Sequence, residues 1–96
     1  MSDHRVQHEV ASGRGRFFIQ HPDGLSELTY TITSPSLVIA DHTVVASGYE
    51  GQGVGLLLLD HLIRTADASG FKIMPLCPFV NAQRRRHPEW AAYFAV

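Results

Sequence analysis

The chain has 96 residues, of which 45% are apolar, and a formal net charge of -1 at pH 7. This length suits one small domain and not two, and the charge excludes a general attraction to nucleic acid. No apolar run approaches the roughly 20 residues that span a bilayer, the first residues lack the apolar core of a signal peptide, and the single cysteine excludes an internal disulfide. We therefore expect one cytoplasmic domain over residues 1–96, partly frayed over residues 1–12, without membrane or nucleic-acid partners.

The first third of the chain has the patterns of antiparallel strands. Residues 6–10 alternate weakly between apolar and polar side chains, which allows a short edge strand. Residues 17–19 begin a second strand, and the Pro-Asp-Gly turn at residues 22–24 predicts a hairpin with the strand that follows. This third strand covers residues 27–33, where apolar side chains alternate with polar ones as in a half-buried strand.

A fourth strand is predicted over residues 37–45. Its apolar run indicates burial on both faces for much of its length, with a polar interruption at Asp41 and His42. Ser47 and Gly48 then break the strand before a glycine-rich loop begins.

The rest of the chain predicts a helix, a strand and a second helix. Residues 53–69 place apolar side chains on one wide helical face, and Gly70 is positioned to cap the C-terminus. Residues 71–74 form a short strand, residues 79–87 a short helix, and residues 89–94 a further helical turn. A strand, helix and strand in succession form a right-handed crossover with parallel strands. We expect an α+β fold: a mixed, mostly antiparallel sheet with a βαβ crossover and the long helix on one face.

The glycine-rich loop at residues 50–55, with the sequence Glu-Gly-Gln-Gly-Val-Gly, ends where the long helix begins. Glycine lets a ligand approach the backbone closely, and the first helical turn offers N–H donors without intrahelical partners. The helix dipole adds partial positive charge at the same place. The loop is therefore a candidate phosphate site, and the alternative is a tight turn that serves only to start the helix.

Cys77 is a candidate site residue because it follows the last predicted strand. The carboxyl ends of two parallel strands lie at one edge of a sheet, so Cys77 and the glycine-rich loop should lie close together. The alternative is a buried cysteine that acts as a small apolar side chain.

His42 and the arginines at residues 84–86 are weaker candidates. His42 could be a general base near neutral pH, but a hydrogen-bonded core residue is the interpretation that we favour. The arginines could contact a phosphate, although such a run usually forms a solvated helix face. The six histidines share no spacing that is typical of a metal site, and no metal is predicted.

Five blocks of sequence, taken together, resemble a known family. They are residues 24–30 (GLSELTY), 42–45 (HTVV), 51–55 (GQGVG), 75–80 (PLCPFV) and 86–90 (RHPEW). Over residues 17–90 the chain resembles the small, single-domain branch of the GCN5-related N-acetyltransferases (GNAT proteins), the compact YjdJ-like proteins.

The resemblance implies that acetyl-coenzyme A is the acyl donor and that an unidentified amine is the acceptor. It implies a strand that pairs with the pantetheine arm, a loop that binds the pyrophosphate through backbone N–H groups, and a gap between two strands that holds the thioester beside the cysteine. The residues at the matching positions are, for the strand, Thr43, Val44 and Val45; for the loop, Glu50, Gly51, Gln52, Gly53, Val54 and Gly55; and near the thioester, Cys77 and Asn81.

The chain departs from the family pattern at three places near the loop. Glu50 stands where arginine is usual, Ala46 and Ser47 where prolines are common, and Leu56 where many relatives have a polar residue. These departures concern cofactor affinity, because the backbone donors of the loop do not depend on them.

The function expected from the sequence is acetyl-coenzyme A-dependent N-acetylation by direct attack of the amine, with His42 or a water as base. Two other interpretations remain open: a covalent acetyl-cysteine at Cys77, and a non-catalytic coenzyme A-binding module or partner subunit. A different nucleotide-binding protein is disfavoured because the loop lacks the Lys-Ser/Thr of a P-loop. We expect a monomer or weak homodimer.

Overall fold

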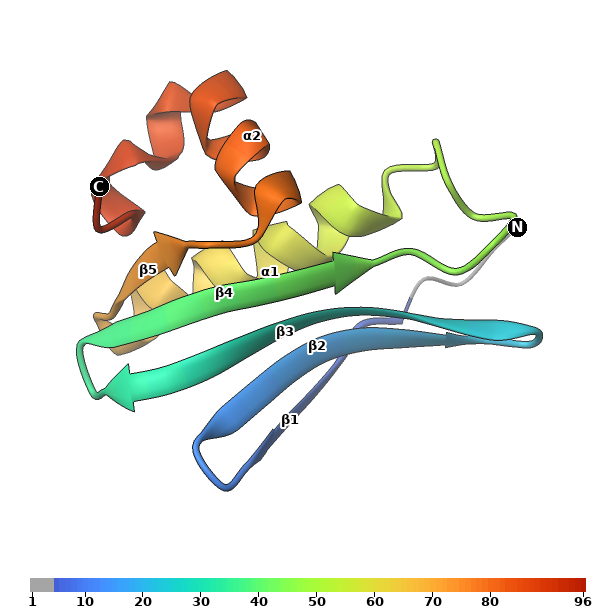
Figure 1. Cartoon of the computed structure of the whole chain (residues 1–96), viewed down its shortest axis with the longest axis horizontal. Coiled ribbons are helices and arrows are strands. Elements are labelled where there is room, and N and C mark those ends of the chain that lie inside the picture. Colours follow the sequence, from blue (N-terminus) through green and yellow to red (C-terminus); the bar gives the residue numbers. More distant parts are fainter. Residues whose placement is uncertain (1–4) are drawn as a thin grey trace.

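Five strands form one sheet whose spatial order is their order in the chain. The computed structural model describes residues 5–96. Strands β1 to β4 pair antiparallel in turn, and β5 pairs parallel to β4 after the crossover through α1 (Figure 1). The elements are β1 (Gln7–Ala11), β2 (Arg14–His21), β3 (Gly24–Ser34), β4 (Leu37–Val44), α1 (Val54–Ser69), β5 (Lys72–Pro75), α2 (Pro78–Arg86) and a 3-10 helix, η1 (Pro88–Tyr93). The predicted α+β class, mixed sheet and βαβ crossover are confirmed.

The predicted edge strand is present as β1, which pairs along its whole length with β2. All five of its residues are exposed, because only one neighbour and no helix cover it. Residues 1–4, which belong to the segment expected to fray, lie outside the described residues.

Helix α1 packs its apolar face on one side of the sheet and forms the core. Leu58, Leu59 and Leu62 are fully buried there. Gly70 caps the helix with φ 81° and donates its N–H to the Ala66 carbonyl at 2.8 Å, as the sequence predicts. The sheet face turned to the viewer in Figure 1 carries no helix of the described residues, and we call it the open face.

A β-bulge in β4 corrects two predictions. Tyr30 pairs with Ala40 and Thr29 pairs with His42, which leaves Asp41 as an extra residue. An extra residue reverses which face the following side chains occupy. His42 is therefore exposed on the open face, and its expected place in the core is wrong. The strand is also not buried on both faces, since residues on the open face remain partly or fully exposed.

Candidate active site

The edge of β4 that faces β5 is paired only in its first half. The ladder between them ends where Ala40 pairs with Pro75, and the Cys77 N–H then donates to the Ala40 carbonyl at 2.9 Å. Figure 1 shows β4 running on beyond the end of β5 while the chain turns into α2. The second half of β4 thus has a ladder partner only in β3 among the described strands. Such an edge can pair with an extended ligand.

The glycine-rich loop presents backbone donors at the N-terminus of α1. Gly51 and Gly53 have φ of 78° and 79°, which other residues rarely adopt, so glycine is required there. Gly53 is the N-cap residue, and no side chain caps the helix or places an acidic group in its first turn. Leu57 donates to the Gly53 carbonyl at 2.9 Å. The N–H groups that precede Leu57 in the first turn are left for an anion.

Gly55 has a different role from the two loop glycines. A Cβ at this position would lie 2.9 Å from Cζ of Phe79, so the missing side chain lets α2 pack closely against the start of α1. A cavity of about 420 Å³ lies between the loop and α2, and its lining residues are Val45, Tyr49, Glu50, Gly51, Gly53, Val54, Gly55, Leu56, Phe79, Gln83 and Arg86.

Two opposite charges flank this cavity. The Glu50 carboxylate accepts the Gly48 N–H at 2.8 Å and is thereby folded onto its own loop. Arg86 contributes a guanidinium from the last turn of α2. The charges of Glu50 and Arg86 offset each other, so the helix dipole and the first-turn N–H groups remain as the net attraction for an anion.

A buried hydrogen-bond network ties the β2–β3 turn to the segment that enters the loop. Ser26 Oγ accepts the Ala46 N–H at 2.9 Å and lies 2.8 Å from Nε2 of His21. The His21 ring stacks on Tyr49 at 3.7 Å, and the Tyr49 hydroxyl donates to Asp23 at 3.1 Å. The bond to Asp23 raises the pKa of Tyr49. The network holds residues 46–49, which lead directly into the glycine-rich loop.

Cys77 is both buried and adjacent to the free edge of β4. Its side chain is 2% exposed, and Sγ lies 3.3 Å from Oγ1 of Thr43. The bulge makes this contact possible, because it turns Thr43 to the face of Leu28, its fully buried partner on β3. Cys77 is also the N-cap residue of α2, and its carbonyl accepts the Asn81 N–H at 2.9 Å.

The residues predicted from the sequence fall into three groups in space. Those that line the cavity are Val45, Glu50, Gly51, Gly53, Val54 and Gly55. Thr43 and Cys77 meet at the gap between β4 and α2. Others lie apart from the cavity: His42 and Val44 are exposed, the Gln52 amide donates to the Gly48 carbonyl, and the Asn81 side chain accepts from Arg84.

Sequence reasoning missed part of the α2 contribution and all of the buried network. Phe79, Gln83 and Arg86 are spaced by four and three residues, which places them on one helical face. That spacing was a usable signal. Ser26 and His21 gave a weaker signal for the buried network, since each is a polar residue on the buried face of a strand.

Within residues 5–96, no three His, Cys, Asp or Glu side chains are grouped to hold a metal ion. No helix in that range is both long and apolar enough to cross a membrane.

Comparison with known proteins identifies the family. The family model described as GCN5-related N-acetyl-transferase matches residues 16–93. The chain belongs to this family. A search among curated proteins gives no match.

A solved relative agrees with the GCN5-related fold. The NMR solution structure of a GCN5-like protein from Staphylococcus aureus, described provisionally as an N-acetyltransferase, superposes with a TM-score of 0.74. The sequences are 25% identical, and the match covers 98% of this chain and 90% of that one.

Proposed function

We propose that this GCN5-related protein transfers an acetyl group from acetyl-coenzyme A to an amine. The observation that carries the proposal is the set of uncapped N–H groups at the start of α1, which open into the cavity that Arg86 borders. A pyrophosphate carries the charge and the acceptor oxygens that such a site binds. The residues present therefore fit the phosphate end of coenzyme A.

The rest of the ligand would extend in two directions from the loop. Thr43, Val44 and Val45 lead from the gap to the cavity, so the pantetheine arm would pair along this edge with its sulfur near Cys77. In the other direction, a second cavity of about 360 Å³ shares Gly53 and Leu56 with the first and has room for the adenosine end. Asn81 would act through α2 rather than by touching the phosphates, since its side chain is held by Arg84.

Acetyl transfer requires the acceptor nitrogen to bond to the acetyl carbon while the carbon–sulfur bond breaks. The electron pair of that bond leaves with sulfur, and the proton lost by nitrogen must reach a base. His42, exposed beside the free edge of β4, is the proposed base, directly or through a water. Backbone N–H groups of the free β4 edge would polarise the carbonyl oxygen.

Direct attack is favoured over a covalent acetyl-cysteine. A nucleophile must reach the acetyl carbon, and the Cys77 sulfur is buried against the Thr43 hydroxyl. We propose that Cys77 closes one wall around the thioester, which is the use of a small, polarisable side chain.

Release of free coenzyme A thiol from acetyl-coenzyme A tests the proposal. We expect thiol to appear only when both acetyl-coenzyme A and an amine are present. Cys77→Ser should retain turnover within about threefold, because direct attack needs no thiolate, whereas a covalent route would lose several orders of magnitude.

A non-catalytic coenzyme A-binding module is the second candidate, and Glu50 in place of the family's usual arginine is the observation that favours it. Saturable binding of coenzyme A without thiol release from any amine in a broad panel would establish that candidate and contradict the enzyme. We further propose a single cytoplasmic domain, active as a monomer or weak homodimer.

A further inference from the structure

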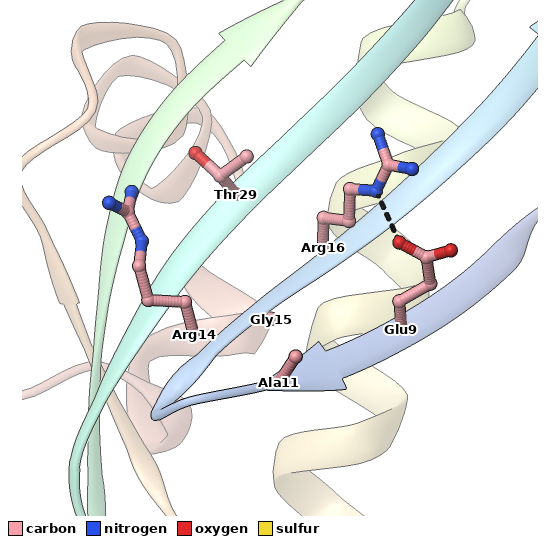
Figure 2. Close-up of a pocket in the computed structure, with 6 residues that line it drawn as sticks. All are labelled: Glu9, Ala11, Arg14, Gly15, Arg16 and Thr29. Atoms are coloured by element: carbon pink, nitrogen blue, oxygen red, sulfur yellow. Dashed lines mark hydrogen bonds and ion pairs between the residues drawn. The ribbon is translucent and has the colours of Figure 1, made fainter.

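A small depression lies on the open face of the sheet, away from the coenzyme A cavity. Its volume is about 230 Å³, and it is built by β1, β2 and β3 from Glu9, Ala11, Arg14, Gly15, Arg16 and Thr29. Figure 2 shows the side chains of Arg14 and Arg16 on either side of Gly15, with Thr29 on the neighbouring strand. Two guanidinium groups therefore border one hollow.

Arg16 is fixed in place by its neighbours. It donates to Glu9 at 2.9 Å and to Glu27 at 3.0 Å, and its guanidinium lies 4.0 Å from the centre of the Phe18 ring. The hydrogen bonds to Glu9 and Glu27 raise the pKa of Arg16, and the bond to Glu9 has the larger effect. The two carboxylates offset the charge of Arg16 and take its Nε donor and one Nη1 donor, so the Nη2 donors and the second Nη1 donor are those that remain to hydrogen-bond a ligand.

Arg14 is held more loosely. Its side chain is 63% exposed, and its contact with Asp41 is 3.5 Å long. The same Asp41 oxygen already accepts the Thr31 hydroxyl at 2.8 Å. Arg14 can therefore turn its planar set of donors toward a carboxylate in the hollow.

The Thr29 hydroxyl independently supports a ligand in the hollow. Its hydroxyl is the buried side-chain polar atom that lacks a hydrogen-bond partner within residues 5–96. Figure 2 shows its methyl group, not the hydroxyl, on the side of Arg16. Rotation about the Cα–Cβ bond would exchange the two and bring the hydroxyl toward a ligand between the arginines. A buried hydroxyl without a partner is destabilising, so a ligand oxygen here would be favoured.

The hollow is aligned with the proposed reaction centre. Thr29 pairs with His42 on β4, and the other edge of β4 borders the gap toward β5. Two strand spacings, about 10 Å, separate the hollow from that gap. When Arg14 turns to the ligand, the Asp41 carboxylate on β4 loses this cation, and its negative charge nearer the gap favours an ammonium group there.

We propose that the acceptor is a primary amine that also carries a carboxylate, about 10 Å from its nitrogen, and that Arg14, Arg16 and Thr29 bind this carboxylate. The inference rests on the proposed acetyl transfer. It assigns the open face to the acceptor and leaves the opposite side of the gap to acetyl-coenzyme A.

The test compares ω-amino acids of increasing chain length with alkylamines of the same lengths, at saturating acetyl-coenzyme A. The KM of the best ω-amino acid should be about tenfold below that of its matched alkylamine, the gain expected from one charge-assisted pair. Arg14→Gln should remove that advantage while the KM values for the alkylamine and for acetyl-coenzyme A change less than about twofold. Arg85→Gln, on the exposed side of α2, is the matched control and should change none of them.

Equal KM values for ω-amino acids and alkylamines would overturn this inference and leave acetyl transfer intact. Absence of thiol release with every amine would instead overturn the proposed function. The hollow is then tested alone by NMR titration with 8-aminooctanoate, whose extended chain matches the proposed separation of nitrogen and carboxylate. Saturable shifts of the amide signals of Arg14, Gly15 and Arg16, lost in Arg14→Gln, would support the site, and no saturable shift would refute it.

Discussion

At the scale of single residues, charge and backbone conformation decide what the loop can bind. Gly53 is constrained by its positive φ, so any larger side chain there would strain the backbone as well as crowd a ligand. Substitution of the loop glycines therefore cannot separate ligand contact from folding. The charged residues that flank the loop give the cleaner experiment.

Neutralising Glu50 and Arg86 should change coenzyme A affinity in opposite directions. Glu50→Gln keeps an oxygen that can accept the Gly48 N–H but removes the charge, and Arg86→Gln removes the facing cation. A unit charge about 6 Å from a phosphate contributes about 0.7 kcal/mol in water-like surroundings and about 3 kcal/mol at an effective dielectric of 20. Because the loop is exposed, we expect two- to tenfold tighter binding for Glu50→Gln and a similar loss for Arg86→Gln.

Titration calorimetry at low and high salt measures both effects, which should shrink as salt rises. Arg85→Gln serves as the control for removing one positive charge from the same helix. If Glu50→Gln leaves affinity unchanged at low salt, the carboxylate points away from the phosphates, and the departure from the family's arginine has no bearing on cofactor binding.

At the scale of elements, a hairpin turn positions the loop. Ser26 lies on β3, yet its hydroxyl holds the backbone of Ala46, just before the loop. Residues 46–49 thus depend on a contact between two residues that lie 20 positions apart in the sequence. Local pattern cannot reveal such a contact, because nothing in a turn sequence specifies what packs behind it.

Removing the Ser26 hydroxyl should loosen this connection. Ser26→Ala removes the hydrogen bonds that the Ser26 hydroxyl makes with the Ala46 N–H and with His21, at a cost of about 1–3 kcal/mol. In a chain of this size that lowers Tm by at least about 4 °C, and coenzyme A should bind more weakly because the loop is less ordered. Ser47→Ala, an exposed position in the same segment, is the matched control. Thermal unfolding with and without coenzyme A measures both effects, and equal behaviour of the two variants would show that the network does not support the loop.

The bulge in β4 marks the limit of prediction at this scale. Strand, helix and crossover followed from periodicity and glycine placement, and the structure confirms them. The position of His42 could not be predicted from periodicity, because strict alternation from Val38 and Ala40 assigns its side chain to the core. The one extra residue at Asp41 sends it to the open face and brings Thr43 to Cys77.

At the scale of the whole molecule, the sheet would separate the two substrates of the proposed reaction. Helices α1 and α2, the glycine-rich loop and Cys77 lie around one side of the β4 edge, and His42 lies on the other with the arginines of β2. That the loop and Cys77 lie at the same edge of the sheet could be predicted, because parallel strands bring their carboxyl ends together. Arg86 was a candidate from the sequence and Gln83 shares its helical face, but their place beside the loop depends on how α2 packs, and the hollow on the open face depends on how β1 packs.

Backbone NMR of the chain titrated with coenzyme A tests the central claim most directly. The account predicts that the largest amide shifts fall on residues 53–56, at the start of α1, and on residues 43–45, along the free edge of β4. Pantetheine, which lacks the pyrophosphate, should bind more weakly and should not shift the amide signals of residues 53–56. Saturable shifts confined to other parts of the molecule, or no shifts at millimolar coenzyme A, would contradict the account.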